Sequence, residues 1–308
     1  MHHLCNVMPS HNQSKGIFYA IVAAIMWGVL AIALKVTLQF LPSPSIVWIR
    51  FSIAFLLLFV YMAIKQPNSL SIFLKPPKKL IIASLCLAFN YFGYMKGLEY
   101  TSPGTAQVFI QLGPVLFAIA GIYIFKEKIN WKHILGFIVI IAGLGLFYWE
   151  QISDMASQKM YSLGILWVIG AAVSWAVYAI YQKDLSHQTS TNQLNIFIYG
   201  FCTLLFVPFP KYSNFLNLGT GAWLLVIFLG INTLVAYGSI ALAFRHLVSS
   251  KVSVIITMNP LLTFALMYIF SVANVSWIAP EHFSILSILG AAMALGGTIF
   301  VILFTRKE

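Results

Sequence analysis

The segment Ala24–Lys35 reads AIMWGVLAIALK, and a related segment, AVSWAVYAIYQK, follows at Ala172–Lys183. Both are apolar almost throughout and end in lysine, and they align Trp27 with Trp175 at an offset of 148 residues. Two more pairs of short motifs recur at offsets of 146 and 154 residues, QLGP at 111–114 with TMNP at 257–260, and ILG at 134–136 with ILG at 288–290. We interpret the chain as a duplication of one unit.

The composition around these segments is that of a membrane protein. Hydrophobic residues make up 60% of the 308 residues, and charged residues only 8%. Soluble domains have about 45–50% apolar and about 25% charged residues. The few charged residues of this chain could not cover a water-facing surface. We therefore predict an integral membrane protein whose surface faces lipid.

The apolar segments predict an all-α fold of ten transmembrane helices. A helix needs about 20 predominantly apolar residues to cross the hydrocarbon core. The predicted spans are residues 17–38, 45–64, 79–98, 104–124, 132–149, 162–182, 192–209, 221–243, 251–273 and 284–304. The predicted domains are an N-terminal tail at 1–16, a first five-helix half at 17–150, a second at 161–304 and a tail at 305–308.

Lysines and arginines predict the orientation. Thirteen of the 18 fall in the N-terminal tail, the C-terminal tail and every second loop, and only three fall in the alternate loops. This asymmetry follows the positive-inside rule with both termini cytoplasmic, and it explains the net charge of +11 without a nucleic-acid partner. Because each half has an odd number of spans, the second half enters the membrane from the opposite side. Inverted repeats of this kind are typical of secondary transporters, and a duplicated helical bundle without a transport role is the alternative.

Several residues also carry a family resemblance. They are Trp27-Gly28 in the first span, Arg50 in the second, Pro114 in the fourth, Glu127 just after it, Gly136…Gly143 in the fifth and Gly290…Gly297 in the tenth. Over 17–304 the chain resembles the EamA-type transporters of the drug/metabolite transporter superfamily. The second half departs from the pattern, because no acidic residue follows the ninth span at the position where Glu127 follows the fourth. The resemblance implies transport of amino acids, other metabolites, nucleotide sugars or drugs, without choosing among them.

Two ionisable residues lie within predicted spans, where a charge is costly and marks a candidate functional site. Arg50 lies in the outer part of the second span and needs carbonyls, an acid or an anionic ligand as a partner. Lys35 lies late in the first span, and it either contributes to the same positive outer vestibule or reaches the outer interface with its long side chain. We expect this vestibule to favour carboxylate-bearing cargo.

Polar and aromatic residues at helical spacing mark the faces that could line a cavity. Interhelical hydrogen bonding explains any single one of them equally well. The remaining candidate substrate-binding residues are Trp27, Asn90, Tyr94, Gln107, Gln111, Trp175, Tyr178, Asn232, Tyr237 and Asn259. Pro114 and Pro260 each fall about ten residues into a span, so they are candidate midplane hinges or merely structural kinks.

The fifth and tenth spans are rich in glycine and poor in polar groups. They carry Gly136, Gly143, Gly145, Gly290, Gly296 and Gly297. Small residues permit close helix contact, so we place these spans at the periphery, where they could form a homodimer interface. Packing within one chain explains them equally well.

The sequence also disfavours other functions. It contains no Walker motif for ATP hydrolysis, no metal-ligand motif and no cofactor motif, and it offers no paired acids or histidine cluster for an intramembrane enzyme. A channel would need a continuous polar lining, whereas these polar positions are sparse. Because no acid lies deep in a span, we expect facilitated export or exchange rather than proton coupling. The prediction is a non-enzymatic carrier of small polar metabolites in the cytoplasmic membrane, with amino acids as the first cargo to test.

Overall fold

The computed structural model describes residues 12–127, 131–155, 159–186, 188–279 and 284–304. Helices dominate these ranges, and no strand occurs within them. The first half contains α1 (Gln13–Thr37), α2 (Ser43–Lys65), the 3-10 helix η1 (Pro67–Phe73), α3 (Lys78–Tyr100), α4 (Pro103–Phe109), α5 (Leu112–Tyr123) and α6 (Trp131–Met155). The second half contains α7 (Lys159–Leu185), α8 (Thr191–Phe206), α9 (Ser213–Leu216), α10 (Thr220–His246), α11 (Ser249–Ile256), α12 (Asn259–Val272) and α13 (Ile285–Phe304).

Seven helices in the described part of the chain are long and apolar enough to cross a membrane. They are α1, α2, α3, α4 together with α5, α7, α10, and α11 together with α12. The three other predicted spans coincide with α6, α8 and α13, of which α8 has only 16 residues. A helical membrane protein is therefore confirmed, whereas the count of ten spans rests on the sequence.

Two predicted boundaries differ from the structure more than the others do. Helix α1 begins at Gln13, within the stretch predicted as a tail, because the side chain of Asn12 accepts a hydrogen bond from the backbone amide of Lys15 at 3.2 Å. Such a cap allows polar residues to form the first helical turn. Helix α6 continues to Met155, beyond the predicted end of its span at residue 149.

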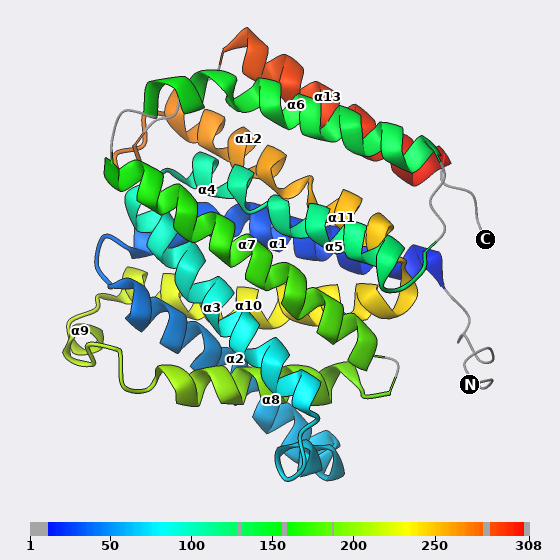
Figure 1. The fold of residues 1–308 in the computed structure, drawn as a ribbon. Coiled ribbons are helices and arrows are strands. Elements are labelled where there is room, and N and C mark those ends of the chain that lie inside the picture. The colour runs from blue at the N-terminus through cyan, green and yellow to red at the C-terminus, as the bar shows by residue number, and fades with distance from the viewer. Residues whose placement is uncertain (1–11, 128–130, 156–158, 187, 280–283, 305–308) are drawn as a thin grey trace.

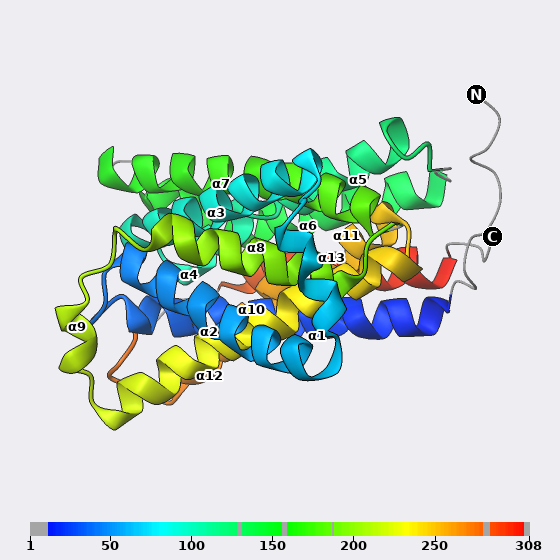
Figure 2. The same ribbon diagram turned by 90° about the horizontal axis from the view of Figure 1, so that it is seen from below.

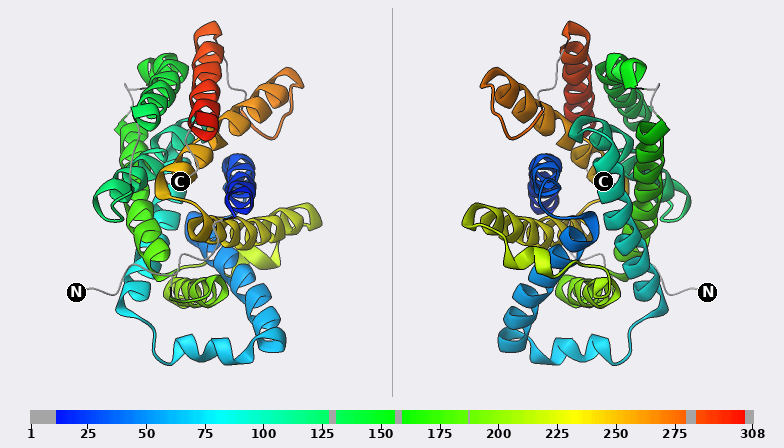
Figure 3. Two further views of the ribbon diagram at one scale, coloured as in Figure 1. Left: turned by 90° about the vertical axis from the view of Figure 1, so that its right-hand side faces the viewer. Right: turned by 90° about the vertical axis from the view of Figure 1, so that its left-hand side faces the viewer.

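The long helices lie side by side, and the start of α1 and the end of α13 lie at the same end of the bundle (Figures 1 and 2). We call this the terminal end and the other the opposite end. The packing is crosswise, in the sense that helices of the first half pack on helices of the second: α1 on α10, α3 on α7, and α2 on α8. In an end-on view, α1 lies near the centre of the bundle, and α6 and α13 stand together at one edge (Figure 3).

The fourth span of each half is broken in the middle. Helix α4 ends at Phe109 and α5 begins at Leu112, whereas α11 ends at Ile256 and α12 begins at Asn259. Pro114 has no amide hydrogen for the carbonyl of Ile110, which instead accepts from the amide of Gly113 at 3.0 Å. The predicted kinks are thus breaks, and each lies within one turn before its proline.

Candidate functional site

A cavity of about 70 Å³ lies among the central helices, beside both breaks. Sites that hold one water need about 10–15 Å³ on this measure, so the cavity has room for several waters or a small metabolite. Ten of the predicted residues line it: Trp27, Arg50, Asn90, Tyr94, Gln107, Gln111, Pro114, Trp175, Tyr237 and Asn259. Residues from both halves therefore form one site.

Three lining residues were not predicted from the sequence, namely Leu30, Tyr91 and Ile110. Leu30 follows Trp27 by three positions and Ile110 follows Gln107 by three, so both share a helix face with a predicted residue. That spacing could have identified them. Tyr91 is adjacent to Asn90 and would have required knowledge of how α3 packs.

Four candidates lie outside the cavity lining. Tyr178 is fully buried against the ring of Tyr237, with 5.7 Å between ring centres. Asn232 donates to the backbone carbonyl of Met26 at 2.8 Å, which is an interhelical hydrogen bond. Pro260 lies in the first turn of α12. The fourth candidate, Lys35, donates to two backbone carbonyls, those of Leu98 at 2.8 Å and Thr101 at 2.7 Å.

Arg50 is the cation of the cavity. It is only 3% exposed, its Nε donates to Thr233 Oγ1 at 3.1 Å, and its guanidinium carbon lies 4.4 Å from the centre of the Tyr91 ring. Among the described residues, no carboxylate lies within ion-pair distance of Arg50, and its terminal nitrogens make no hydrogen bond. A guanidinium has five N–H donors. The cavity therefore offers unused, positively charged donors to a ligand.

Amide side chains form a second polar region of the cavity. Gln111 Nε2 donates to Asn259 Oδ1 at 2.8 Å and to the backbone carbonyl of Gln107 at 3.2 Å. Because a carbonyl can only accept, these contacts fix which end of the Gln111 amide is nitrogen. Its Oε1 is buried and has no partner among the described residues. A ligand with an N–H group could satisfy it.

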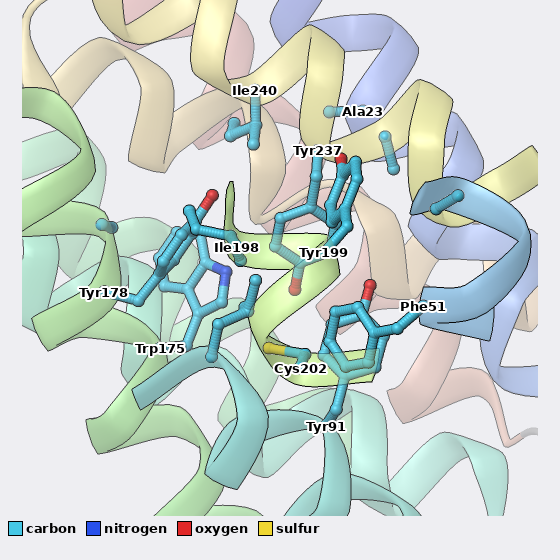
Figure 4. Packing of buried hydrophobic residues seen from close by; sticks show 14 of the residues in the cluster. Ala23, Phe51, Tyr91, Trp175, Tyr178, Ile198, Tyr199, Cys202, Tyr237 and Ile240 are labelled. Carbon is cyan, nitrogen blue, oxygen red and sulfur yellow. The ribbon is translucent and has the colours of Figure 1, made fainter. Parts of the chain in front are cut away.

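Aromatic rings surround these polar groups. Trp27 lies 5.9 Å from Trp175 and 5.5 Å from Tyr237, measured between ring centres. Tyr91 lies 5.5 Å from Tyr237 in the same way. Figure 4 shows Trp175, Tyr178, Tyr237, Tyr199 and Tyr91 gathered in the core beside Phe51. Rings of this kind provide apolar walls, and their faces attract cations.

The remaining chemistry of the described residues is sparse. No three His, Cys, Asp or Glu side chains among them group closely enough to hold a metal ion. A buried ion pair that was not predicted, Lys183–Glu127, lies at the terminal end, with 2.7 Å between Nζ and Oε1. The two residues are 56 positions apart, and no pattern in the sequence pairs them.

A membrane-spanning helical bundle with a central cavity shared by two duplicated halves has the architecture of a small-molecule transporter. The chain belongs to the EamA-like transporter family, which it matches over residues 14–149 and 162–303. It is similar to the uncharacterised inner membrane transporter YhbE of Escherichia coli K12, with 32% identity over 92% of this chain and 90% of the relative. The resemblance stated from the sequence is therefore confirmed.

Two further comparisons concern cargo and fold. A probable amino-acid metabolite efflux pump of Escherichia coli K12 is 24% identical over 64% of this chain and 63% of its own length. A protein crystal structure matches with a TM-score of 0.73 and 18% identity, covering 95% of this chain and 98% of that one. At this identity the likeness concerns the fold alone.

Proposed function

We propose that this chain is a secondary carrier that moves small carboxylate-bearing metabolites, amino acids among them, across the cytoplasmic membrane by alternating access. Its ten spans form two inverted five-helix halves, and both termini are cytoplasmic. The crosswise packing of the halves supports this arrangement, because each central helix of one half contacts a helix of the other. The names of the relatives support the inner membrane and amino-acid cargo.

The observation that carries the proposal is the state of Arg50. A buried charge normally requires a partner of opposite charge or several hydrogen bonds. Here only one hydrogen bond and one aromatic face are present among the described residues, and the guanidinium lines the cavity. A carboxylate in the cavity would form the bidentate pair for which a guanidinium is suited. The cargo thus supplies the missing partner.

The amide region extends this reasoning to amino acids. The unpartnered Oε1 of Gln111 accepts a hydrogen bond from the cargo ammonium, and the ring faces of Trp27 and Trp175 stabilise its charge. Buried acceptors without a donor cost about 1–3 kcal/mol. A zwitterion that satisfies both Arg50 and Gln111 removes both penalties at once.

The test compares the binding of three ligands to purified protein, and binding is measured by thermal shift or calorimetry. The ligands are valine, valinamide without the carboxylate, and isovalerate without the ammonium. We expect wild-type protein to prefer valine over both, Arg50→Gln to lose the preference over valinamide, and Gln111→Leu to lose the preference over isovalerate. Each loss should be roughly tenfold or more, since removing one partner of a charged hydrogen bond costs about 1.5–3 kcal/mol.

Gln182→Leu is the matched control. The amide nitrogen of Gln182 also donates to an asparagine oxygen, that of Asn195 at 3.1 Å, and its Oε1 also has no partner among the described residues. Gln182 does not line the cavity, so Gln182→Leu should keep both preferences. Proteoliposome counterflow then separates a carrier from a channel, because only a carrier is stimulated by unlabelled cargo on the far side. Binding that is equal for all three compounds would reject the proposed role of Arg50.

A further inference from the structure

Lys183 ties three parts of the chain together at the terminal end. It lies in the last turns of α7, and its ammonium donates to Glu127 Oε1 at 2.7 Å, to Ser249 Oγ at 2.8 Å and to the carbonyl of Leu247 at 3.4 Å. These contacts use all three N–H donors of the ammonium. The side chains of Lys183 and Glu127 are each only 8% exposed.

Glu127 completes the junction from the other side. Its carboxylate accepts hydrogen bonds from the amide of Ser249 at 2.7 Å and that of Ser250 at 3.3 Å, the first two residues of α11. A carboxylate there satisfies amides that have no partner within the helix. The segment after α5, the end of α7 and the junction of α10 with α11 are therefore held by one network.

The elements approach closely at this point. A Cβ added to Gly121 would lie 2.7 Å from Glu127 Oε2 and 2.9 Å from the Cβ of Ser249. Only glycine leaves enough space for α5 and α11 to come this close. The network thus closes a tight contact between the fourth spans of the two halves.

Buried aromatic rings lie between this network and the cavity. Phe117 is fully buried, and its ring centre lies 6.1 Å from that of Trp175 in the cavity wall and 6.0 Å from the Lys183 ammonium. Phe244 packs on Phe117 with 5.0 Å between ring centres. These packed rings lie between the cavity wall and the Lys183 network.

A related junction lies at the opposite end. Lys35 is the repeat mate of Lys183, and it bonds the carbonyls of Leu98 and Thr101 where α3 meets α4. The duplication extends to the backbone, because Lys126 and Asn274, which are 148 residues apart, both have positive φ, at 54° and 49°. The position equivalent to Glu127 is held by Val275, which packs on an apolar cluster of Ile32, Met267 and Ile278.

We infer that the network of Lys183, Glu127 and the start of α11 is the latch that closes the terminal end, and that the Lys35 junction is its repeat-related counterpart. Both junctions are formed in this structure. Release of the Lys183 network opens the terminal end, and release of the Lys35 junction opens the opposite end. The inference rests on the proposed alternating access. A buried ion pair between Lys183 and Glu127 holds the terminal end.

The test measures opening without cargo or transport. In a variant whose Cys5, Cys86 and Cys202 are replaced, Ser253→Cys introduces a thiol of similar size one turn beyond Ser249 on α11. Ser253 is fully buried, so a water-soluble maleimide should label it slowly. Glu127→Gln should raise the labelling rate at least about tenfold, because loss of one partner of a buried ion pair is strongly destabilising. Lys35→Met should lower the rate, because it favours opening at the other end.

Gly121→Ala provides a second route to the same state. It leaves both charges in place, but its methyl group would push Glu127 and Ser249 apart. The labelling rate of Ser253→Cys should therefore rise again. An unchanged labelling rate in Glu127→Gln or in Gly121→Ala would overturn the latch. A rise in Glu127→Gln, Gly121→Ala and Lys35→Met alike would also overturn it, because it would show a general loosening of the fold. If wild-type protein shows counterflow but labelling is unchanged in Glu127→Gln and Gly121→Ala, the latch is rejected and the transport function is not. If wild-type protein shows no counterflow, the transport function is rejected instead.

Discussion

At the scale of single residues, Arg50 in the cavity has no acidic partner among the described residues, whereas Lys183 at the terminal end has one. Arg50 and Lys183 are similarly buried, but only Lys183 has a carboxylate at 2.7 Å. Breaking a buried ion pair is costly, whereas binding an anion stabilises a buried guanidinium that has no acidic partner. This difference suits Arg50 to binding and Lys183 to closure.

Glu127 gives the protein a predictable response to acid. Burial alone would raise the pKa of its carboxyl, but the charge of Lys183 and hydrogen bonds from Lys183 and Ser249 outweigh burial and lower that pKa below its ordinary value of 4.5. A lowered pKa in the folded state contributes stability that is present above 4.5 and is lost as the pH falls through the folded-state value.

We therefore expect the thermal midpoint in detergent to fall in acid below that pH. Glu127→Gln should be less stable than wild type at neutral pH and should show a smaller acid-dependent decrease. Thermal denaturation of the two proteins over a pH series measures both effects. Parallel pH profiles would contradict a stabilising role of the ionised carboxylate.

At the scale of helices, α6 and α13 pack against each other within one chain. A Cβ on Gly297 would lie 3.0 Å from Ile140 Cγ1 and 3.2 Å from the carbonyl oxygen of Gly136, so this face of α13 is already occupied. A Cβ on Gly296 or Gly145 would meet nothing within 4 Å. A homodimer through the two helices, as proposed from the sequence, would therefore use the open face.

Paired substitutions on α13 separate the two roles of its glycines. Gly297→Leu should lower the thermal midpoint, because overpacking typically costs about 1–3 kcal/mol. Gly296→Leu should leave the midpoint of the monomer unchanged, and it should abolish a dimer if the open face forms one. Light scattering in detergent gives the mass of each variant. A wild-type mass equal to one chain would reject the dimer.

At the scale of the whole molecule, the crosswise packing joins the two halves through the cavity. Gln111 of the first half donates to Asn259 of the second, and Trp27 meets Trp175, its repeat mate. The cavity therefore exists only when both halves are folded together. Rocking of the halves against each other would change access to it without unfolding either one.

The proposed orientation is measurable in cells. In a variant without native cysteines, Lys211→Cys should react with a membrane-impermeant maleimide in intact cells. Lys75→Cys should react only after the membrane is permeabilised. Both lysines are exposed to the surroundings of the protein, so differences in labelling report the side of the membrane. Labelling of Lys75→Cys in intact cells would reverse the proposed orientation.

The sequence by itself determined that this is a duplicated helical membrane protein of the EamA type, because hydropathy and residue identity are local properties that need no packing. It also selected most of the residues that line the cavity, since polar side chains within apolar spans either line a cavity or hydrogen-bond to a neighbouring helix. Tertiary structure alone decided that the prolines follow breaks rather than kinks, that Asn232 serves an interhelical hydrogen bond, and that Lys183 pairs with Glu127. The last two outcomes depend on contacts between residues that are 206 and 56 positions apart, and no periodicity along the chain encodes such distances.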